Sequence, residues 1–285
     1  MLSLDQRPLP YKSRAMASGN DIQVLQKPII LFNDYGSAFK EGEAFVTDHI
    51  FSYIVSGIQE VWSGNQTHVF KAGDYRFFRR NQLTKYVKRP GQHGFKSVAV
   101  HIDQGTVREM AEVYGPSEKP YPGKNIELLP PNASLESYVN SLAPYGNPPG
   151  AYGEALVALK AKELVLLLLQ ARPVLRHALF DFTDPGKIDL VSFMNTHYRY
   201  NVGLERMAFL TGRSLSTFKR DFQKAFNTTA GRWLTQRRLE EAYYLIGQKG
   251  KTASEIYLDL GFEDLSHFSF AYKKAYGKAP SRGRL

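Results

Sequence analysis

The chain has 285 residues, a length that favours two domains, and its hydrophobic fraction of 43% is enough for folded cores. It contains no cysteine, which excludes disulfides, thiolate metal sites and cysteine nucleophiles. No apolar run is long enough to span a bilayer, and the first residues lack the continuous apolar core of a signal peptide. We therefore expect a cytoplasmic protein with no membrane partner.

The net charge of +10 is concentrated in the last third of the chain. Residues 188–285 contain 16 Lys and Arg against 9 Asp and Glu, whereas residues 1–187 contain 21 against 18. This distribution is typical of a domain that binds a polyanion, attached to a nearly balanced domain, although basic surfaces also occur for solubility alone.

After a polar tail over residues 1–22, short apolar or alternating runs separated by turn residues predict β-strands. The runs occupy residues 29–32, 49–57, 68–70, 75–78, 82–88 and 95–102. Strands of this length and spacing favour an all-β sandwich or barrel of the jelly-roll type.

Helices follow the predicted strands. Two short helices are expected at residues 106–115 and 133–142, and a longer one begins near Glu154 and is ended or kinked by Pro173. The apolar stripe of the long helix consists of Leu156, Leu159, Leu166 and Leu169. It can pack against the sandwich or pair with a second subunit, and we expect any dimer to use the helices of residues 133–180. The first domain then covers residues 23–180, and residues 181–187 form the linker.

The second domain, residues 188–285, has helical patterns throughout. The expected helices cover residues 188–199, 204–210, 214–226, 229–247, 252–261 and 264–276. A capping box at Thr252–Glu255 opens the fifth of these helices, Gly261 closes it, and Asp264 caps the sixth. The order is helix–turn–helix, a long helix, then a second helix–turn–helix. A 19-residue connector spans roughly 28 Å, close to the ~34 Å at which the major groove returns to one face of DNA.

The helix at 214–226, SLSTFKRDFQKAF, has a pattern that recurs fifty positions later. Its apolar face carries Leu215, Phe218, Phe222 and Phe226, and its polar face carries Ser216, Thr217, Lys219, Arg220, Gln223 and Lys224. In the repeat, Phe218 corresponds to Phe268, and Asn227 to Gly277. Asparagine and glycine best tolerate the left-handed conformation that ends a helix. A solvated basic face explains one such helix, but two copies in one chain are hard to explain by chance.

These residues resemble the DNA-binding domain of the AraC/XylS family of bacterial transcription regulators. The resemblance covers residues 188–285, and its most specific part is LGFED, SHFS, YKKAYG and the following proline within residues 259–280. By fold pattern and domain order alone, the first domain is similar to the cupin-type sensing domain of many members. The implied fold class is α+β with two domains: a cupin-like β-sandwich with flanking helices, then an all-α domain with two helix–turn–helix units.

The resemblance also implies which side chains face DNA. On the first helix they are Ser216, Thr217, Lys219, Arg220 and Gln223, together with Lys224; on the second they are Ser266, His267, Phe270 and Lys273. Lys219 and Arg220 can donate to guanine O6 and N7. Phe270 departs from the family, which often has a base-contacting arginine there. We expect this helix either to read a thymine methyl or to contribute less specificity, and the alternative is that Phe270 is a partly buried packing residue. Tyr257 replaces a small alanine, and Gly283 an aromatic residue before Arg284.

By family analogy the protein is an activator rather than a repressor, with double-stranded DNA, a second copy of itself and RNA polymerase as partners. Its first domain senses a small molecule or a protein. One alternative is a cupin-type metabolite-binding protein or enzyme whose basic tail associates with DNA. Cupin metal sites use an H-x-H pair, whereas His49, His68, His93 and His101 are isolated, so we expect no metal, cofactor or catalytic residue. The other is a DNA binder without base preference.

Overall fold

The computed structural model describes residues 27–64, 66–117, 119–145 and 152–280. The predicted polar tail, part of the Pro- and Gly-rich stretch at 143–153, and the departure at Gly283 lie outside the described residues. The chain divides into two compact units between Thr183 and Asp184.

The first unit contains two antiparallel sheets. The first sheet has the strand order β1 (Ile29–Asp34), β8 (Lys96–Ile102), β3 (His49–Ser56), β6 (Tyr75–Phe78) and β9 (Ile126–Leu129). The second has the order β2 (Lys40–Val46), β7 (Gln82–Arg89), β4 (Ile58–Ser63) and β5 (Gln66–Lys71). All six predicted strands are confirmed within a few residues, and so is the two-sheet sandwich. The cupin likeness stays a prediction.

Three strands, β2, β4 and β9, were absent from the prediction. In β2, Glu43 lies opposite Lys85 of β7, and their side chains form an ion pair at 2.7 Å, so charge pairing takes the place of alternation. Strand β9 lies within a Pro-rich stretch and pairs with β6, in a register that places Glu127 opposite Phe77. Such long-range pairing leaves no local signal in the sequence.

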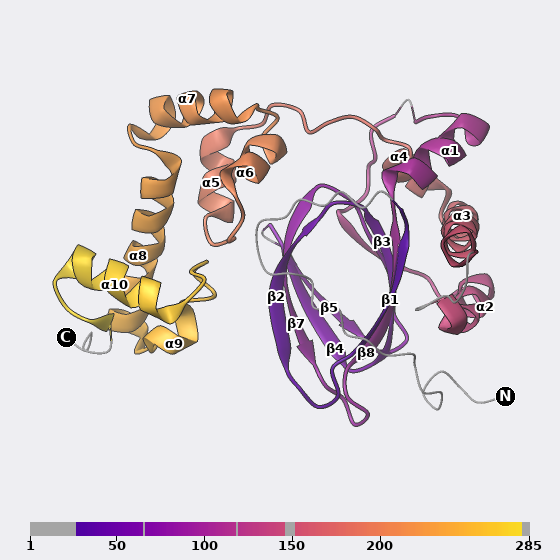
Figure 1. Ribbon diagram of the computed structural model, residues 1–285, viewed down its shortest axis with the longest axis horizontal. Coiled ribbons are helices and arrows are strands. Elements are labelled where there is room, and N and C mark those ends of the chain that lie inside the picture. The colour runs from indigo at the N-terminus through magenta and orange to yellow at the C-terminus, as the bar shows by residue number, and fades with distance from the viewer. Residues whose placement is uncertain (1–26, 65, 118, 146–151, 281–285) are drawn as a thin grey trace. The chain divides into compact units, whose positions relative to one another are not determined.

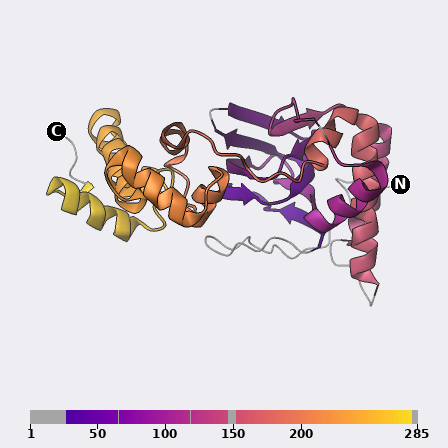
Figure 2. The ribbon, with the colours of Figure 1, turned by 90° about the horizontal axis from the view of Figure 1, so that it is seen from above.

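Helices cover the outer face of the first sheet, as Figure 1 and Figure 2 show. They are α1 (Gln104–Tyr114), α2 (Ala133–Ser141), α3 (Gly153–Ala171) and α4 (Arg176–Leu179), with 3-10 turns η2 (Ala143–Tyr145) and η3 (Pro173–Leu175). A core between sheet and helices joins Phe51 and Val100 to Leu164 and Leu168. A separate cluster that includes Ile54 and other strand residues fills the sandwich. Because both faces of the first sheet are covered, all four residues of β6 are buried.

Of the two alternatives for the leucine stripe of α3, packing against the sandwich does not hold for three of its four residues. The helix buries Val157, Ala161, Leu164, Val165 and Leu168, whereas Leu156, Leu159 and Leu166 are 41%, 61% and 42% exposed. Leu169 is partly buried. All six residues from 164 to 169 are apolar, so periodicity alone does not choose the face that packs.

The second unit is helical throughout its described residues. Its helices are α5 (Leu190–His197), α6 (Leu204–Leu210), α7 (Leu215–Phe226), α8 (Ala230–Lys249), α9 (Ala253–Ile256) and α10 (Leu265–Tyr276). The predicted α+β fold with an all-α second part is confirmed. The helix expected to reach Gly261 stops at Ile256 instead. Turns follow it, in which Gly261 N–H donates to Leu258 O, three residues back, and Phe262 N–H donates to Tyr257 O, five residues back.

Helix α8 packs against both helix–turn–helix units. Near its start, Trp233 contacts Phe222 and Phe226 of α7, with ring centroids 5.8 and 4.8 Å apart. Near its end, Ala242 and Ile246 belong to one core with residues of α9 and α10. Figure 1 shows α7 at one end of α8 and α10 at the other. The helix therefore acts as a common spacer within this unit.

Candidate DNA interface

Helix α7 begins and ends where its sequence predicts. The Ser214 hydroxyl accepts a hydrogen bond from the Thr217 N–H at 3.3 Å, which caps the start. Asn227 ends the helix in the left-handed conformation, with φ of 52°. Phe218 and Phe222 are fully buried, so one face of α7 is committed to the core and the opposite face to solvent.

Helix α10 repeats this construction. The Asp264 carboxylate accepts from the His267 N–H at 2.6 Å, and Gly277 ends the helix with φ of 72°. Phe268 and Tyr272 occupy the buried positions that Phe218 and Phe222 occupy in α7. Both helices have 12 residues. The fifty-residue repeat in sequence is therefore a repeat in structure.

A glycine with positive φ lies in the turn before each of these helices. Gly212 has φ of +65°, and a Cβ added to it would lie 2.4 Å from the carbonyl carbon of Gly186. Gly261 has φ of +81°, and its added Cβ would lie 2.3 Å from the carbonyl oxygen of Arg199. Each turn needs glycine for its backbone conformation and for close approach of the chain.

Nine of the ten predicted DNA-facing residues are exposed. On α7 these are Ser216, Lys219, Arg220, Gln223 and Lys224, and on α10 they are Ser266, His267, Phe270 and Lys273. Thr217 is half-buried, and its hydroxyl accepts from Ser214 at 3.0 Å. Phe270 is 69% exposed, which excludes the alternative that it is a packing residue. The fold thus places the ten residues on two helices at the two ends of α8.

Sequence reasoning missed a cluster of charges around Asp221 of α7. Arg213 Nε donates to Asp221 Oδ2 at 3.0 Å, and the Arg213 side chain is only 7% exposed. Lys187 Nζ lies 3.4 Å from Oδ2, and Arg220 Nε lies 3.7 Å from Oδ1. The hydrogen bond from Arg213 holds the pKa of Asp221 below its ordinary value, and Lys187 adds to this effect. Residues eight positions apart give no helical periodicity signal, so the pair was not apparent.

Arg238 is a second residue that the sequence did not single out. Its Nε donates to Tyr198 O at 2.7 Å, Nη1 to Gly261 O at 2.7 Å and Nη2 to Tyr200 O at 2.9 Å. One side chain of α8 therefore satisfies carbonyl groups after α5 and in the turn before α10. The adjacent Arg237 stacks over the Tyr198 ring at 4.7 Å.

The histidines of the sandwich do not form a metal cluster. His49 is fully buried, stacks on Phe77 with centroids 5.4 Å apart, and accepts the Arg80 N–H at 3.4 Å. Burial lowers the pKa of His49 to about 3 and that of His101 to about 4. Among the described residues, no group of His, Asp and Glu side chains could hold a metal ion. No helix in the described ranges has the length and apolarity to cross a membrane.

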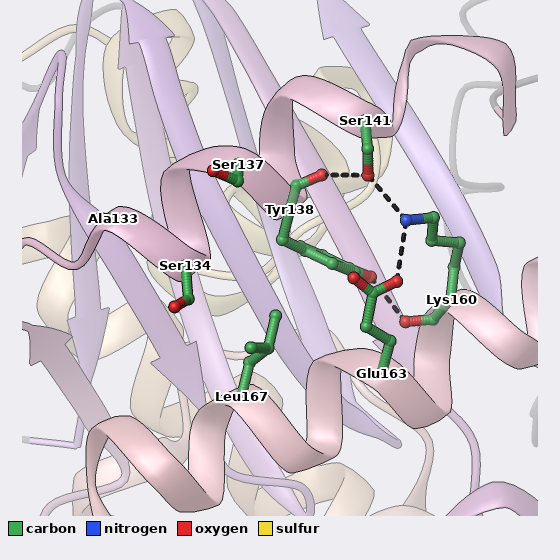
Figure 3. Close-up of a pocket in the computed structure, with 8 residues that line it drawn as sticks. All are labelled: Ala133, Ser134, Ser137, Tyr138, Ser141, Lys160, Glu163 and Leu167. Carbon is green, nitrogen blue, oxygen red and sulfur yellow. Dashed lines mark hydrogen bonds and ion pairs between the residues drawn. The ribbon is translucent and has the colours of Figure 1, made fainter.

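A hollow of about 410 Å³ lies between α2 and α3, and Figure 3 shows its lining. Lys160 Nζ donates to Ser141 Oγ at 2.7 Å and pairs with Glu163 at 2.8 Å. The Tyr138 hydroxyl donates to Lys160 O at 2.9 Å. Ser134 and Ser137 complete the polar side of the hollow. These bonds join α2 to α3 and leave a hydroxyl-rich surface between them.

Two family models match the chain. A helix-turn-helix domain matches residues 207–284, and the ExsA N-terminal regulatory domain matches residues 49–175. The first match contains α7 to α10, and the second begins at β3 and ends within the helical layer.

Three curated relatives are similar to part of the chain. The HTH-type transcriptional regulator ExsA of Pseudomonas aeruginosa is 28% identical over 131 residues, which are 45% of this chain and 47% of ExsA. The thermoregulatory protein LcrF of Yersinia pestis is 27% identical over 136 residues, 47% of this chain and 50% of LcrF. The XylDLEGF operon transcriptional activator of Pseudomonas putida is 29% identical over 106 residues, 36% of this chain and 33% of the activator.

The chain spans about half the length of ExsA and LcrF. Among solved structures, a single-residue variant of apo ToxT from Vibrio cholerae aligns with 92% of this chain and 97% of its own, with 12% identity and a TM-score of 0.45. The two family models, which match an AraC-type helix-turn-helix domain and an ExsA-type regulatory domain in this order, show that the chain belongs to the AraC/XylS family of transcription regulators.

Proposed function

We propose that this protein is a sequence-specific DNA-binding transcription regulator that reads DNA with α7 and α10. The observation that carries the proposal is the pair of capped helices, each with a buried aromatic face and an exposed polar face, at the two ends of one helix. A helix that enters the major groove needs this division between a face for the core and a face for base edges.

The length of α8 supports reading by both helices. Its 20 residues span about 30 Å at 1.5 Å per residue. Successive major grooves on one face of B-form DNA are ~34 Å apart. Two recognition helices joined by such a spacer fit two neighbouring grooves on the same side of one duplex.

The two helices offer different chemistry to the bases. Lys219 and Arg220 can donate to guanine O6 and N7, and Gln223 can pair with adenine. On α10 the position of Arg220 is taken by Phe270, whose exposed ring suits contact with a thymine methyl. We therefore assign most of the hydrogen-bonded specificity to α7. Lys224 and Lys273 are exposed cations that add attraction to phosphates.

The exposed leucines of α3 support self-association. Leu156, Leu159 and Leu166 project from a helix whose other face is packed on the sandwich domain. An apolar stripe left in solvent is a typical protein–protein interface. A second copy that pairs through this stripe would bring two DNA-binding units to tandem or inverted half-sites.

The first unit is the proposed sensing part. Its match to a regulatory domain supports binding of an effector, and the hydroxyl-rich hollow between α2 and α3 is a surface that a small molecule or protein partner could contact. Helix α3 lines the hollow and also carries the proposed dimer stripe, so a molecule bound in the hollow would affect dimerisation. The Pseudomonas putida relative is named a transcriptional activator, which supports activation as the mode of action here. RNA polymerase as the partner and the cytoplasm as the location are proposed by analogy with the family.

Selection from randomised DNA duplexes tests the proposal. The full chain is incubated with the library, bound duplexes are recovered and sequenced, and the affinity of the selected sequence is compared with that of scrambled duplexes. A recurring motif with two elements about one helical turn apart supports the proposal. Equal affinity for all sequences, with log affinity falling by about 0.9 per phosphate contact against log salt, contradicts it and favours a binder without base preference.

A further inference from the structure

We infer that Asp221 is a positioning residue that, held by Arg213, orients the Arg220 guanidinium toward DNA. The inference rests on the proposed function and adds a mechanism to the first recognition helix. Asp221 lies on α7 beside Arg220, and its two carboxylate oxygens face two different arginines. We call the Arg213–Asp221 pair the clasp.

Arg213 is itself fixed in place. Its Nη1 donates to Ile188 O at 3.0 Å and to Thr211 O at 2.6 Å, while its Nε donates to Asp221 Oδ2 at 3.0 Å. The side chain is 7% exposed, so the polypeptide before α5 and the turn before α7 hold it on several sides. Asp221 therefore has a rigid partner, unlike an ordinary surface ion pair.

The other oxygen of Asp221 is available to Arg220. Arg220 Nε lies 3.7 Å from Oδ1, and the Arg220 side chain is 66% exposed. Guanine is read by the two terminal nitrogens of arginine, which donate together to O6 and N7. The Asp221 carboxylate lies beside Nε of Arg220 and so restrains the guanidinium from the side that does not contact the base. Restricting a long side chain before binding reduces the conformational entropy lost on contact.

The second helix–turn–helix unit provides an internal comparison. Fifty positions after Arg213, Arg220 and Asp221 the chain has Glu263, Phe270 and Ala271. The clasp and the arginine are thus both absent from α10, although the caps and the aromatic core are repeated. Glu263 is engaged elsewhere and accepts from Asn201 at 3.2 Å. If the clasp served only to fold a helix–turn–helix, α10 would need an equivalent.

Lys187, in the predicted linker, also contacts the clasp. Lys187 Nζ lies 3.4 Å from the same Oδ2 that Arg213 contacts. Gly186, the preceding residue, approaches Gly212 in the turn before α7. The chain segment that enters the DNA-binding unit therefore touches the recognition helix at the residue that we assign to positioning Arg220.

A double-mutant cycle separates positioning from folding. The variants are Asp221→Asn, Arg220→Ala and the two together, each in the full chain, with Glu263→Gln as a control that also removes one negative charge. The probe is the duplex selected by the wild-type protein and a series in which each base pair is changed in turn. The measured quantity is the ratio of affinities between the selected and the changed duplex, because loss of an acid raises affinity for any DNA.

We expect Asp221→Asn to reduce discrimination on the order of ten-fold at the base pair where Arg220→Ala also reduces it. In the Arg220→Ala background, Asp221→Asn should leave every ratio unchanged, and Glu263→Gln should leave the wild-type ratios unchanged. A uniform change at all base pairs, or an equal effect of Asp221→Asn in both backgrounds, overturns the inference. If the wild-type protein selects no sequence, the proposed function itself fails, which is a different result from a selected sequence that ignores Asp221.

Discussion

Arg238 Nη1 donates a hydrogen bond to the carbonyl oxygen of Gly261 at 2.7 Å, which ties the middle of α8 to the turn before α10. The same side chain also donates to Tyr198 O and Tyr200 O. The bond to Gly261 fixes the turn of the second helix–turn–helix unit to α8, and the other two bonds fix the chain after α5 to the same side chain. The spacing of α7 and α10 therefore depends on one arginine as well as on the length of α8.

We expect Arg238→Ala to destabilise the DNA-binding unit, because three carbonyl groups lose a charged donor. Loss of bonds to a charged partner costs about 1.5–3 kcal/mol. The neighbouring Arg237→Ala variant is the control; it removes a stacking contact over Tyr198 worth about 0.5–1 kcal/mol. Urea unfolding of both variants gives the comparison. If both variants lost the same unfolding free energy, the hydrogen bonds from Arg238 to the three carbonyl groups would contribute no extra stability.

The left-handed turn before α7 gives a second prediction. Gly212→Ala places a Cβ at φ of +65° and within 2.4 Å of the Gly186 backbone. The conformation alone costs about 1–2 kcal/mol, and the clash adds to it. Gly231→Ala, in open space on α8, should instead stabilise by about 0.5–1 kcal/mol. Thermal unfolding of the two variants should move the midpoint in opposite directions; a Gly212→Ala protein as stable as wild type would contradict the turn geometry.

The exposed stripe of α3 predicts the effect of charge on self-association. Leu159 is 61% exposed, so Leu159→Glu should leave the fold intact and convert a dimer into a monomer. Val113→Glu, at an apolar position on α1 that is 73% exposed, is the matched control and should leave the dimer unchanged. Light scattering at micromolar concentration reports the mass. A monomeric wild-type protein, with and without DNA, rules out the proposed pairing.

The two buried histidines make stability depend on pH. Their pKa values in the folded protein, about 3 for His49 and about 4 for His101, lie below the ordinary value of 6.5. Below about pH 6.5 the unfolded chain binds protons that the folded chain does not. The stability that each histidine contributes is therefore fully present above about pH 6.5. It is lost as the pH falls, at about 1.4 kcal/mol of unfolding free energy per pH unit for each histidine.

Urea unfolding at a series of pH values between neutral and about pH 5 measures this slope. The His49→Gln variant cannot take up its proton, so the slope should fall by the contribution of one histidine, about 1.4 kcal/mol per pH unit. The comparison with wild type removes the contribution of the carboxyl groups, which titrate in both proteins. A variant with the full wild-type slope would mean that His49 is protonated in the folded state.

The sequence was most informative where local chemistry fixes the structure. Ser214, Asp264 and Gly277 are cap residues whose side chains or backbone conformation act within one turn, and α7 and α10 have the predicted ends. Strands β2 and β9 depend on partners far along the chain, so their own residues carry no period. The packed face of α3 is set by the sheet beneath it, because leucines lie on all sides of that helix.

The candidate site divides in the same way. The exposed face of α7 follows from its amphipathic pattern, and Phe270 could be recognised as a departure from sequence alone. The contacts of Arg213, Asp221 and Arg238 could not, since each joins residues that become neighbours only when the turns close. Charged residues on a helical surface look alike in sequence, whether they face solvent or a fixed partner.

Base reading by Arg220 is tested by the affinity of Arg220→Ala for the selected duplex and for its single-base-pair variants, compared with the wild-type protein at one salt concentration. We expect a loss of about 1–3 kcal/mol on the selected duplex and a relaxed preference at one base pair only. A uniform loss across all duplexes would contradict it, because Arg220 would then contact only the phosphate backbone.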